Sequence, residues 1–475
     1  MANFNAPGVY VQDVASGSQA VSQASSSVGV MIGVTRSGVL GVAQKIRSWT
    51  EFITKYANGL DTPFLENSYL PYAVYGFFTN GGKELYIGSI KKNAVKATAT
   101  STGGVTMTAL TEGVWGNNIS VTIKKMAEYT DDNKVFTVTI SVGTSDSVTI
   151  TDVTKDNLVG VITSNLKAKH WIGSVSVTEG ATDLVEETFT LKDGSDGAEL
   201  TDTDYTDALE MISVLDDVTF VALPGQTSKA VNDAVLTYCE SNNLFPFLDM
   251  PVGSTTDETK TYRKSISSFT GALCHPWGKV TDPITNNLKL VPCSGHAMGV
   301  YARTIQNRGV HKAPAGVDAV VRGFVETEYA LTPAQIGALN PVGVICVTAR
   351  PNVGIVLWGA RSLNSKDNTM KYVTDGLLNL NIKKSLYEGT QFAVFEPNDE
   401  TLWSKIQATC KAFLETLRLS GALKGSQKEA YYVTVDNTNN TKDSIAEGQL
   451  NIEIGYAPVK PAEFVVIKLA HSIEA

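Results

Sequence analysis

Residues 391–425 read QFAVFEPNDETLWSKIQATCKAFLETLRLSGALKG, and this stretch has the clearest structural pattern in the chain. It predicts a helix that begins at Asn398 or Asp399, where a side-chain oxygen can cap the free N–H groups of the first turn. Gly421 and Gly425 end that helix, and the apolar run Phe392–Phe395 before it predicts a short strand. The apolar side of the helix consists of Leu402, Ile406, Cys410, Phe413, Leu414 and Leu417.

Three runs of strand-like residues follow the helix: Tyr431–Val435, Leu450–Ile454 and Phe464–Leu469. Pro458 and Pro461 separate the last run from the other two. A strand at the end of a proline-containing linker is free to pair outside its own domain. We therefore expect residues 458–475 to form an arm that adds a strand to a neighbouring subunit.

A second arm is predicted at the N-terminus, residues 1–27. APGVYVQDV, residues 6–14, alternates like a short strand. Residues 15–27 are small, polar and rich in Ser, as flexible linkers are. A linker of about 13 residues reaches on the order of 40 Å, more than pairing within one domain needs.

Between the arms the patterns predict an α/β multidomain protein with an all-β insertion. Buried strands alternate with helices in residues 28–91 and again in residues 201–362. Residues 92–200 are rich in Thr, Ser, Val and Gly with period-2 runs, which predicts an inserted β-barrel or sandwich. Residues 363–457 form a C-terminal α+β domain.

Composition excludes several classes of protein. The formal net charge is −9 and no run of five Lys or Arg occurs, which argues against nucleic acid as the main partner. No apolar run approaches the ~20 residues that span a bilayer, and the first residues lack the pattern of a signal peptide. Five scattered cysteines are typical of reduced thiols in a protein made in the cytoplasm.

Candidate chemistry is sparse. Ser294 and His296 lie too close in sequence to define a triad, which geometry must identify. Cys274-His275 and Cys293-x-x-His296 resemble two halves of a zinc site, although adjacent side chains point apart. Asp249 ends a predicted strand, Gly278-Lys279 fails the P-loop pattern, and Gly81-Gly82 reads as a helix end. We expect no enzyme activity, no cofactor and no metal.

Several stretches in order resemble the contractile tail sheath proteins of phages and phage-tail-like bacteriocins. The most specific are FAVFEPNDETLW, residues 392–403, and NIEIGYAPVKPAEFVVIKL, residues 451–469. The others are APGVYVQDV, YGFFTNGGKELYI (75–87), EGVWGNNISVTI (112–123), GVYARTIQNRGVHKAPAG (299–316) and NPVGVICVTARPNVGIVLWGARSL (340–363). The resemblance covers nearly the whole chain and implies a subtilisin-like topology for the α/β part.

The resemblance implies a structural, non-enzymatic function. Sheath subunits of this family stack as hexameric rings around an inner tube, and contraction drives the tube through a target cell envelope. The implied partners are further copies of the chain, the tube protein, and baseplate and tail-terminator proteins, without nucleic acid or membrane insertion. The implied location is a virion or tail-like particle assembled in the bacterial host cytoplasm. A type VI secretion sheath fits less well, because that system divides this fold between two chains.

The resemblance also assigns roles to residues. The exchanged strands are Val9, Tyr10, Val11, Phe464, Val465, Val466, Ile467 and Lys468. The receiving sheet is Tyr431, Tyr432, Val433, Val435, Asn451, Ile452 and Ile454. The candidate tube contacts are Lys405, Lys411, Arg418 and Lys424.

Two alternatives from other classes remain open. One is a secreted or surface hydrolase with a carbohydrate-binding β insertion, which would need a convergent acid and base. The other is a passive adhesin or surface-layer subunit, which explains polymerisation but not two arms able to exchange.

Overall fold

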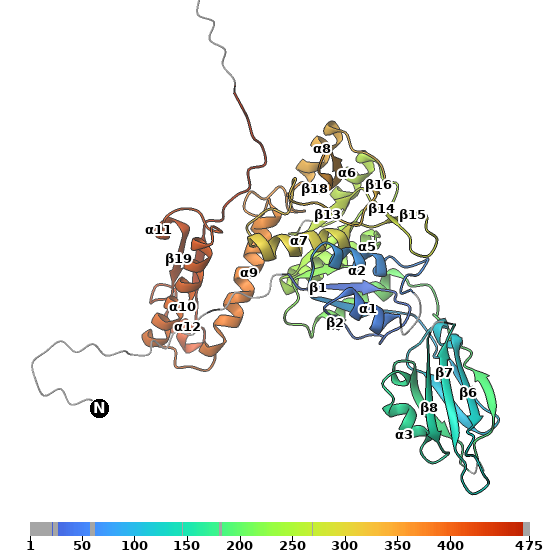
Figure 1. The fold of residues 1–475 in the computed structure, drawn as a ribbon. Helices are drawn as coiled ribbons and strands as arrows, with labels where there is room; N and C mark the ends of the chain where they lie inside the picture. The colour runs from blue at the N-terminus through green and yellow to red at the C-terminus, as the bar shows by residue number, and fades with distance from the viewer. Residues whose placement is uncertain are drawn as a thin grey trace, which may run out of the picture. The chain divides into compact units, whose positions relative to one another are not determined.

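The computed structural model describes residue 21 and residues 27–57, 62–144, 146–179, 183–267 and 269–468. The chain divides into two compact units. The larger unit contains residues 25–380 and 460–475, and the smaller contains residues 381–459 with the first 24 residues. Helix α9, Val373–Gly389, begins in the larger unit and ends in the smaller (Figure 1).

An eight-stranded sheet forms the centre of the larger unit, in the order β18-β17-β13-β12-β11-β1-β3-β2. Six strands are parallel, and the edge strands β2 and β18 are antiparallel. Numbered along the chain, the parallel strands run 2-1-3-4-5-6, a doubly wound order. The strands are β1 Gly29–Gly33, β2 Gln44–Ile46, β3 Leu85–Ser89, β11 Phe220–Ala222, β12 Phe245–Asp249, β13 Ala272–His275, β17 Val344–Arg350 and β18 Gly354–Trp358.

Helices cover both faces of this sheet. Successive residues of each strand point to opposite faces, so the residues on both sides of the strands are buried under helices. Met31 packs with α1, α2 and α7, whereas Val30 and Ile32 pack with η3, α5 and α8. The first face carries α1 Trp49–Tyr56, α2 Leu70–Thr79 and α7 Ser294–Arg308. The second carries α4 Asp202–Asp207, η3 Ala208–Ile212, α5 Lys229–Asn242, α6 Thr256–Ser265 and α8 Pro333–Leu339.

Glycines bring α2 and α7 into close contact. A Cβ added at Gly295 would lie 2.5 Å from the Cα of Ala73, and one at Gly299 would lie 2.5 Å from the carbonyl oxygen of Phe77. At Gly76 an added Cβ would lie 2.4 Å from the His296 ring. The two helix backbones can approach this closely only because three side chains are missing at the crossing.

The β insertion consists of two separate sheets around one core, so the barrel alternative was wrong. One sheet has the order β10-β6-β7-β8 and the other β4-β5-β9, and residues of both share a single apolar cluster around Trp115. Isolated bridges Lys92↔Ala198 and Val95↔Ser195 pair the entering and leaving chain. The elements are β4 Thr98–Thr100, β5 Val105–Ala109, β6 Ile119–Lys125, β7 Phe136–Val142, β8 Asp146–Val153, α3 Leu158–Ser164, β9 Ile172–Val177 and β10 Glu187–Thr190.

A small three-stranded sheet lies outside the main one, in the order β15-β14-β16. Its strands are β14 Gly278–Thr281, β15 Leu288–Val291 and β16 Glu326–Thr327. β15 thus pairs with its hairpin partner β14 and not with the parallel sheet.

The smaller unit is built on α10, Glu400–Leu419. The Asp399 carboxylate accepts the Leu402 N–H at 2.9 Å, and all six predicted apolar positions are buried. The strand predicted at Phe392–Phe395 was wrong: Gln391–Ala393 is a 3₁₀ turn, and Phe395 has a φ of 68° and is fully exposed. The remaining elements are α11 Gln427–Ala430, β19 Tyr431–Thr434, α12 Lys442–Ala446 and β20 Glu453–Tyr456.

Candidate assembly surfaces

Ser294, His296 and Asp249 do not form a catalytic relay. The Ser294 hydroxyl donates to Asp249 Oδ2 at 2.6 Å, and the Ser294 N–H donates to Oδ1 at 2.9 Å. His296 lies against Phe324 and is 1% exposed, and within the described residues neither of its ring nitrogens has a hydrogen-bond partner. Asp249 therefore caps the first turn of α7. Burial raises the pKa of Asp249 to about 6, although the hydrogen bonds from Ser294 oppose the rise.

The two Cys-His pairs have other partners. His275 Nε2 lies 2.6 Å from the Tyr329 hydroxyl, and the Cys293 thiol donates to the carbonyl of Pro276 at 3.0 Å. Burial raises the pKa of both Cys274 and Cys293. Among the residues that the structure describes, no group of three or more His, Cys, Asp or Glu is placed to hold a metal ion.

The other two patterns considered for anion binding also have structural explanations. The Lys279 ammonium pairs with Glu326 at 2.6 Å across neighbouring strands of the small sheet. Gly81 and Gly82 donate to carbonyls of α2 at 3.0 Å and so close the end of that helix, as the sequence predicts.

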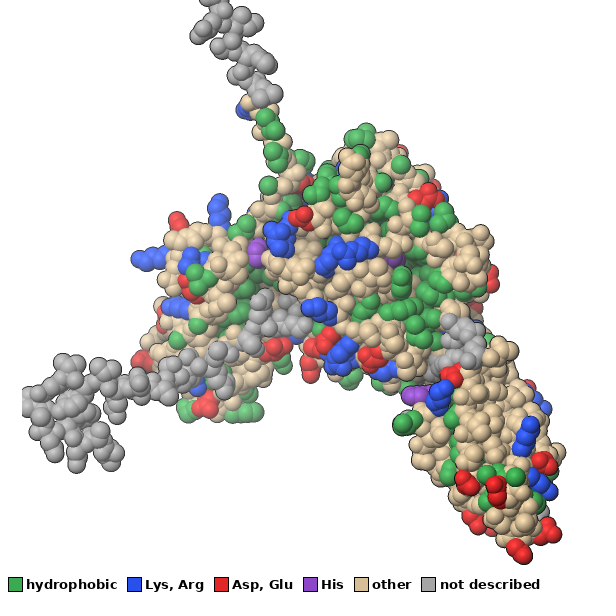
Figure 2. All heavy atoms as spheres, in the orientation of Figure 1, with side chains coloured by type: hydrophobic (Ala, Val, Ile, Leu, Met, Phe, Trp, Pro, Cys, Tyr) green, Lys and Arg blue, Asp and Glu red, His purple; other side chains and the backbone are tan. Residues whose placement is uncertain are grey.

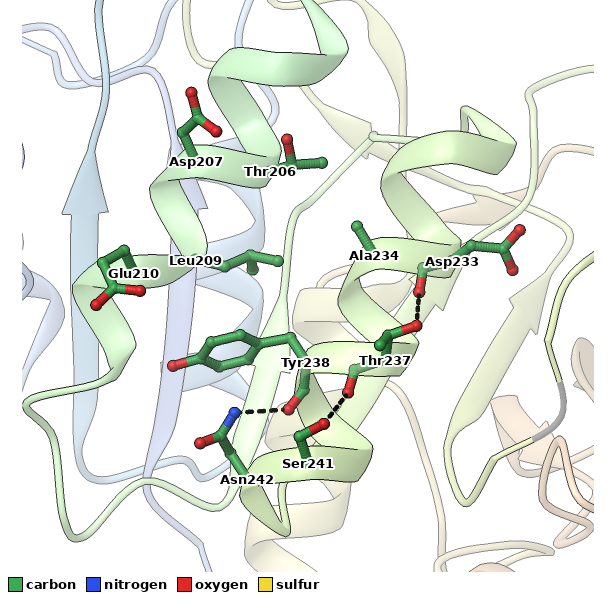
Figure 3. A pocket seen from close by; sticks show the side chains of 10 residues that line it. All are labelled: Thr206, Asp207, Leu209, Glu210, Asp233, Ala234, Thr237, Tyr238, Ser241 and Asn242. Atoms are coloured by element: carbon green, nitrogen blue, oxygen red, sulfur yellow. Dashed lines mark hydrogen bonds between the residues drawn. The ribbon is translucent and has the colours of Figure 1, made fainter.

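A groove of about 840 Å³ lies between α4–η3 and α5 (Figure 3). Leu209, Ala234 and Tyr238 form its apolar floor, and Asp207, Glu210 and Asp233 stand at its edges. The hydroxyl of Thr237 donates to the Asp233 carbonyl at 2.9 Å, and that of Ser241 donates to the Thr237 carbonyl at 3.0 Å. Because these polar groups turn back onto their own helix, the groove has the character of a docking surface more than of a reaction site.

The region predicted as the receiving sheet contains one antiparallel pair, whose second strand begins at Glu453 and not at the predicted Leu450. β19 and β20 form a two-stranded sheet, in which Val433 pairs with Ile454. The Ala457 N–H donates to the Ala430 carbonyl at 2.8 Å. Hydrogen-bonded and non-hydrogen-bonded pairs alternate along an antiparallel ladder, so the N–H and C=O groups of Val433 and Ile454 point away from the partner strand. The Val433 carbonyl accepts the Gln407 side chain at 3.1 Å. The described residues place no third strand beside either edge.

The predicted receiving residues differ in exposure. Tyr431, Val433 and Val435 are buried, Tyr432 is exposed, and Ile452 and Ile454 are half-buried. Asn451 precedes β20 and donates its N–H to Asn440 at 2.7 Å. The sheet thus has one face packed on the unit, and no strand from the described part of the chain pairs with its edges.

The C-terminal segment ends in an apolar run, Phe464–Ile467, which pairs with no strand in the described residues. Residues 461–468 have no regular structure, and Lys468 is exposed with them. The side chains of Phe464, Val465, Val466 and Ile467 are 72%, 82%, 76% and 78% exposed. Leu469 and the N-terminal residues Val9, Tyr10 and Val11 lie outside the described residues.

Glu463 anchors this segment to the larger unit. Its carboxylate accepts Arg361 Nε at 2.8 Å and Nη2 at 2.9 Å, and the Tyr372 hydroxyl at 2.9 Å. Asn340 donates to the same carboxylate. Burial alone would raise the pKa of Glu463, but the hydrogen bonds from Arg361, Asn340 and Tyr372 outweigh it and lower that pKa. Three residues earlier, Lys460 pairs with Asp375 at 2.7 Å. We call residues 460–463 with these partners the anchor.

The sequence does not single out Glu463, because its partners lie 91, 102 and 123 positions away along the chain. Its position immediately before the apolar run is the only sequence signal that would have marked it.

The four candidate tube contacts are not equivalent. Lys405, Lys411 and Lys424 are exposed, and the Lys405 ammonium lies 4.5 Å from the centre of the Phe392 ring. Arg418 forms two hydrogen bonds with Glu415, at 2.9 and 2.6 Å, so its charge is neutralised locally. Within the described residues, no helix is long and apolar enough to span a bilayer.

Two family models match this sequence. The model of the phage tail sheath protein central domain covers residues 198–363, and the model of the phage tail sheath C-terminal domain covers residues 365–470. Together the two models cover more than half of the chain.

Curated relatives agree with these models. The tail sheath protein of Burkholderia phage BcepMu is 25% identical over 63% of this chain and 72% of its own length. The tail sheath protein of Escherichia phage P2 is 23% identical over 52% of this chain, which spans 62% of that relative.

Solved structures share the fold. The sheath tail protein from Desulfitobacterium hafniense superposes with a TM-score of 0.65 at 18% identity, over 90% of this chain and 94% of its own. A sheath complex of the extracellular contractile injection system PVC, in its contracted state, gives a TM-score of 0.64 at 21% identity, over 100% and 99%. A chain of the anti-feeding prophage baseplate gives 0.62 at 20% identity, over 99% and 100%. At these identities the likeness shows a shared mixed α/β multidomain fold.

Proposed function

The chain belongs to the contractile phage tail sheath family, and from this premise we propose that it polymerises with copies of itself as stacked hexameric rings around an inner tube. Contraction of this polymer drives the tube through a target cell envelope. The protein acts mechanically rather than as an enzyme. It is made in the host cytoplasm and becomes part of a virion or a tail-like particle.

Strand exchange is the proposed linkage between subunits. The observation that carries the proposal is the exposed apolar run Phe464–Ile467, which leaves the body immediately after a buried anchor. An apolar strand exposed in the monomer is stabilised when it completes a neighbouring sheet, and each main-chain hydrogen bond contributes about 0.5–1.5 kcal/mol. The two-stranded sheet β19–β20 supplies edges for it, and the N-terminal Val9–Val11 is proposed to add a second strand.

Of the two edges, that of β20 is better suited to the C-terminal arm. The outward carbonyl of Val433 on β19 already accepts Gln407 from α10, so an incoming strand on that side must compete with a side chain. The likeness of the α/β part to subtilisin-like folds remains a prediction about topology, to be tested by strand-by-strand comparison with the doubly wound order of this sheet.

The remaining partners follow from the family. Lys405, Lys411 and Lys424 on the smaller unit are the proposed tube contacts, whereas Arg418 contributes less because Glu415 already holds it. The matched anti-feeding prophage chain belongs to a baseplate, and we propose baseplate and tail-terminator proteins as end partners of the sheath. No specific observation favours the hydrolase alternative, since the Ser294 hydroxyl is bound to Asp249.

Truncation immediately after the anchor tests the linkage. Removing residues 464–475 leaves Lys460 and Glu463 in place, so we expect a folded protein with an unchanged thermal melt that no longer forms ridged hollow tubes by negative-stain microscopy. Val159→Asp is the matched control, because Val159 is 40% exposed and lies in the β insertion. Tubes of normal pitch from the truncated protein would refute strand exchange through this arm. Full-length protein that stays monomeric at all concentrations would refute the sheath function.

A further inference from the structure

A small cavity with positively charged walls lies at the C-terminal end of α7. It has a volume of about 210 Å³, and its lining includes Arg303, Arg308, Lys312 and Asp318. Arg303 is held by the carbonyls of Asn80 and Val320, at 3.1 and 2.7 Å, which leave its charge intact. We call this the basic pocket.

The positive charge of the basic pocket is incompletely balanced. Arg308 and Lys312 share one carboxylate, Asp318, at 4.0 and 3.7 Å, and the Asp318 side chain is 66% exposed. Burial first and then the charge of Arg322 lower the pKa of Arg303, so the cations here oppose one another. Figure 2 shows Lys and Arg side chains gathered over the region of α7.

The groove between α4–η3 and α5 has the opposite charge. Asp207 and Glu210 are exposed at its edge, and neither forms a salt bridge with any described residue. Asp233 is paired with Lys229 on the same helix. The apolar floor of Leu209, Ala234 and Tyr238 would hold the aliphatic parts of long cationic side chains. We call this the acidic groove (Figure 3).

The basic pocket and the acidic groove lie on opposite faces of the same sheet. α7 packs on the face to which Met31 points, whereas α5 and η3 pack on the face to which Val30 and Ile32 point. Both belong to one compact unit, so a single chain cannot bring them together. Two copies can bring them together, and repeating that contact relates each copy to the next by the same rotation and the same spacing.

We propose that the basic pocket of one subunit docks on the acidic groove of the next, with Arg308 and Lys312 facing Asp207 and Glu210. This contact deepens the proposed function and rests on it. It is heterologous, so it repeats from copy to copy and builds a ring or a helix instead of closing a dimer. Copies with a net charge of −9 repel one another, and local complementarity of this kind supplies orientation as well as attraction.

Charge reversal tests the pairing. Arg308→Glu with Lys312→Glu makes both surfaces acidic, and we expect the concentration needed for polymerisation to rise about tenfold or more. Asp207→Lys with Glu210→Lys makes both surfaces basic, with the same expected effect. All four residues lie at the surface or its edge, so circular dichroism and thermal melts should match the wild type.

Recombining the reversals gives the decisive measurement. The quadruple variant carries an acidic pocket and a basic groove, and we expect its polymerisation concentration to return to within about threefold of the wild type. An equimolar mixture of the two double variants should also assemble. Raising salt from ~50 mM to ~500 mM should weaken wild-type assembly, because exposed charges are screened.

Lys124→Glu with Lys125→Glu is the control for net charge, since both lysines are exposed at the end of β6. It should assemble as the wild type does. If wild-type tubes form and either double variant forms them equally well, the inference is overturned and the sheath function stands. If both double variants fail but recombination does not rescue them, each surface binds a different partner and the pairing is wrong. If wild-type protein never assembles, the proposed function itself fails.

Discussion

His296 shows how a single buried residue sets the response of the larger unit to acid. Burial lowers the pKa of His296 to about 3, whereas an unfolded histidine titrates near ~6.5. Between these values the unfolded chain binds the extra proton, so the free energy of unfolding falls as pH decreases below ~6.5.

Replacing His296 with Leu should remove this dependence. We expect the loss of unfolding free energy between pH 7 and pH 5 to shrink by about 2 kcal/mol relative to the wild type, measured by urea denaturation at both pH values. The variant leaves no buried imidazole N–H without a partner, so its stability at pH 7 should change little.

Asp249→Asn is the control of opposite sign. Because burial raises the pKa of Asp249 to about 6, the folded state gains a proton first, and this group stabilises the fold as pH decreases toward ~3.8. The Asn variant should therefore lose more stability between pH 7 and pH 5 than the wild type, by about 1 kcal/mol. An unchanged pH dependence in both variants would contradict the assignment.

At the scale of elements, the contact between α2 and α7 depends on missing side chains. Gly299→Val places methyl groups where a Cβ alone would already lie 2.5 Å from the Phe77 carbonyl oxygen. We expect a loss of about 2–3 kcal/mol in unfolding free energy, measured by thermal or urea denaturation. Gly337→Ala in α8 is the matched control, because no atom lies within 4 Å of its added Cβ. It should gain about 0.5–1 kcal/mol from helix propensity. Equal effects of the two variants would show that the crossing is looser than described.

Elements whose signals are local were predictable from the sequence. α10 is capped by Asp399 and buries the six expected apolar residues, since capping and helical spacing are both local patterns within a few turns. β12, Phe245–Asp249, ends at Asp249 as predicted, because a strand buried on both faces is a continuous apolar run.

Elements without an apolar face were missed. α6 reads TDETKTYRKS and has almost no apolar residues, although its capping box of Thr255 and Glu258 was a usable signal. α8 begins with the same kind of capping box, formed by Thr332 and Gln335. The run Phe392–Phe395 produced the opposite error, a strand predicted where none exists, because its apolar residues lie in an exposed turn.

At the scale of the whole molecule, the anchor determines where the C-terminal arm leaves the body. The sequence predicts an arm but not the point where it is attached. Three residues from distant parts of the chain, Asn340, Arg361 and Tyr372, form that attachment by binding Glu463. Glu463→Ala would leave Arg361 without its carboxylate in a site where its side chain is only 13% exposed. Breaking one partner of such a buried pair costs about 3 kcal/mol or more.

We expect this cost to appear as release of the segment, so chymotrypsin should cut after Phe464 several-fold faster in Glu463→Ala than in the wild type. Because hydrogen bonds lower the pKa of Glu463, the anchor is stable above the ordinary carboxyl range and weakens as pH falls below it. Glu447→Ala, which loses only an exposed bond to Gln449, is the control. Cleavage at the wild-type rate would show that the anchor does not hold the arm.

The way the chain is shared between its two units has a consequence for fragmentation. Val21 lies against Gly389 in the smaller unit, the chain then enters the larger unit, returns within α9, and leaves again near Lys460. The backbone therefore passes between the units three times. No single protease nick can release either unit as a free fragment, and any contiguous piece of the gene that encodes all of the larger unit also encodes residues 381–459 of the smaller one. A subunit cut once between residues 25 and 459 would therefore keep parts of both units on each fragment.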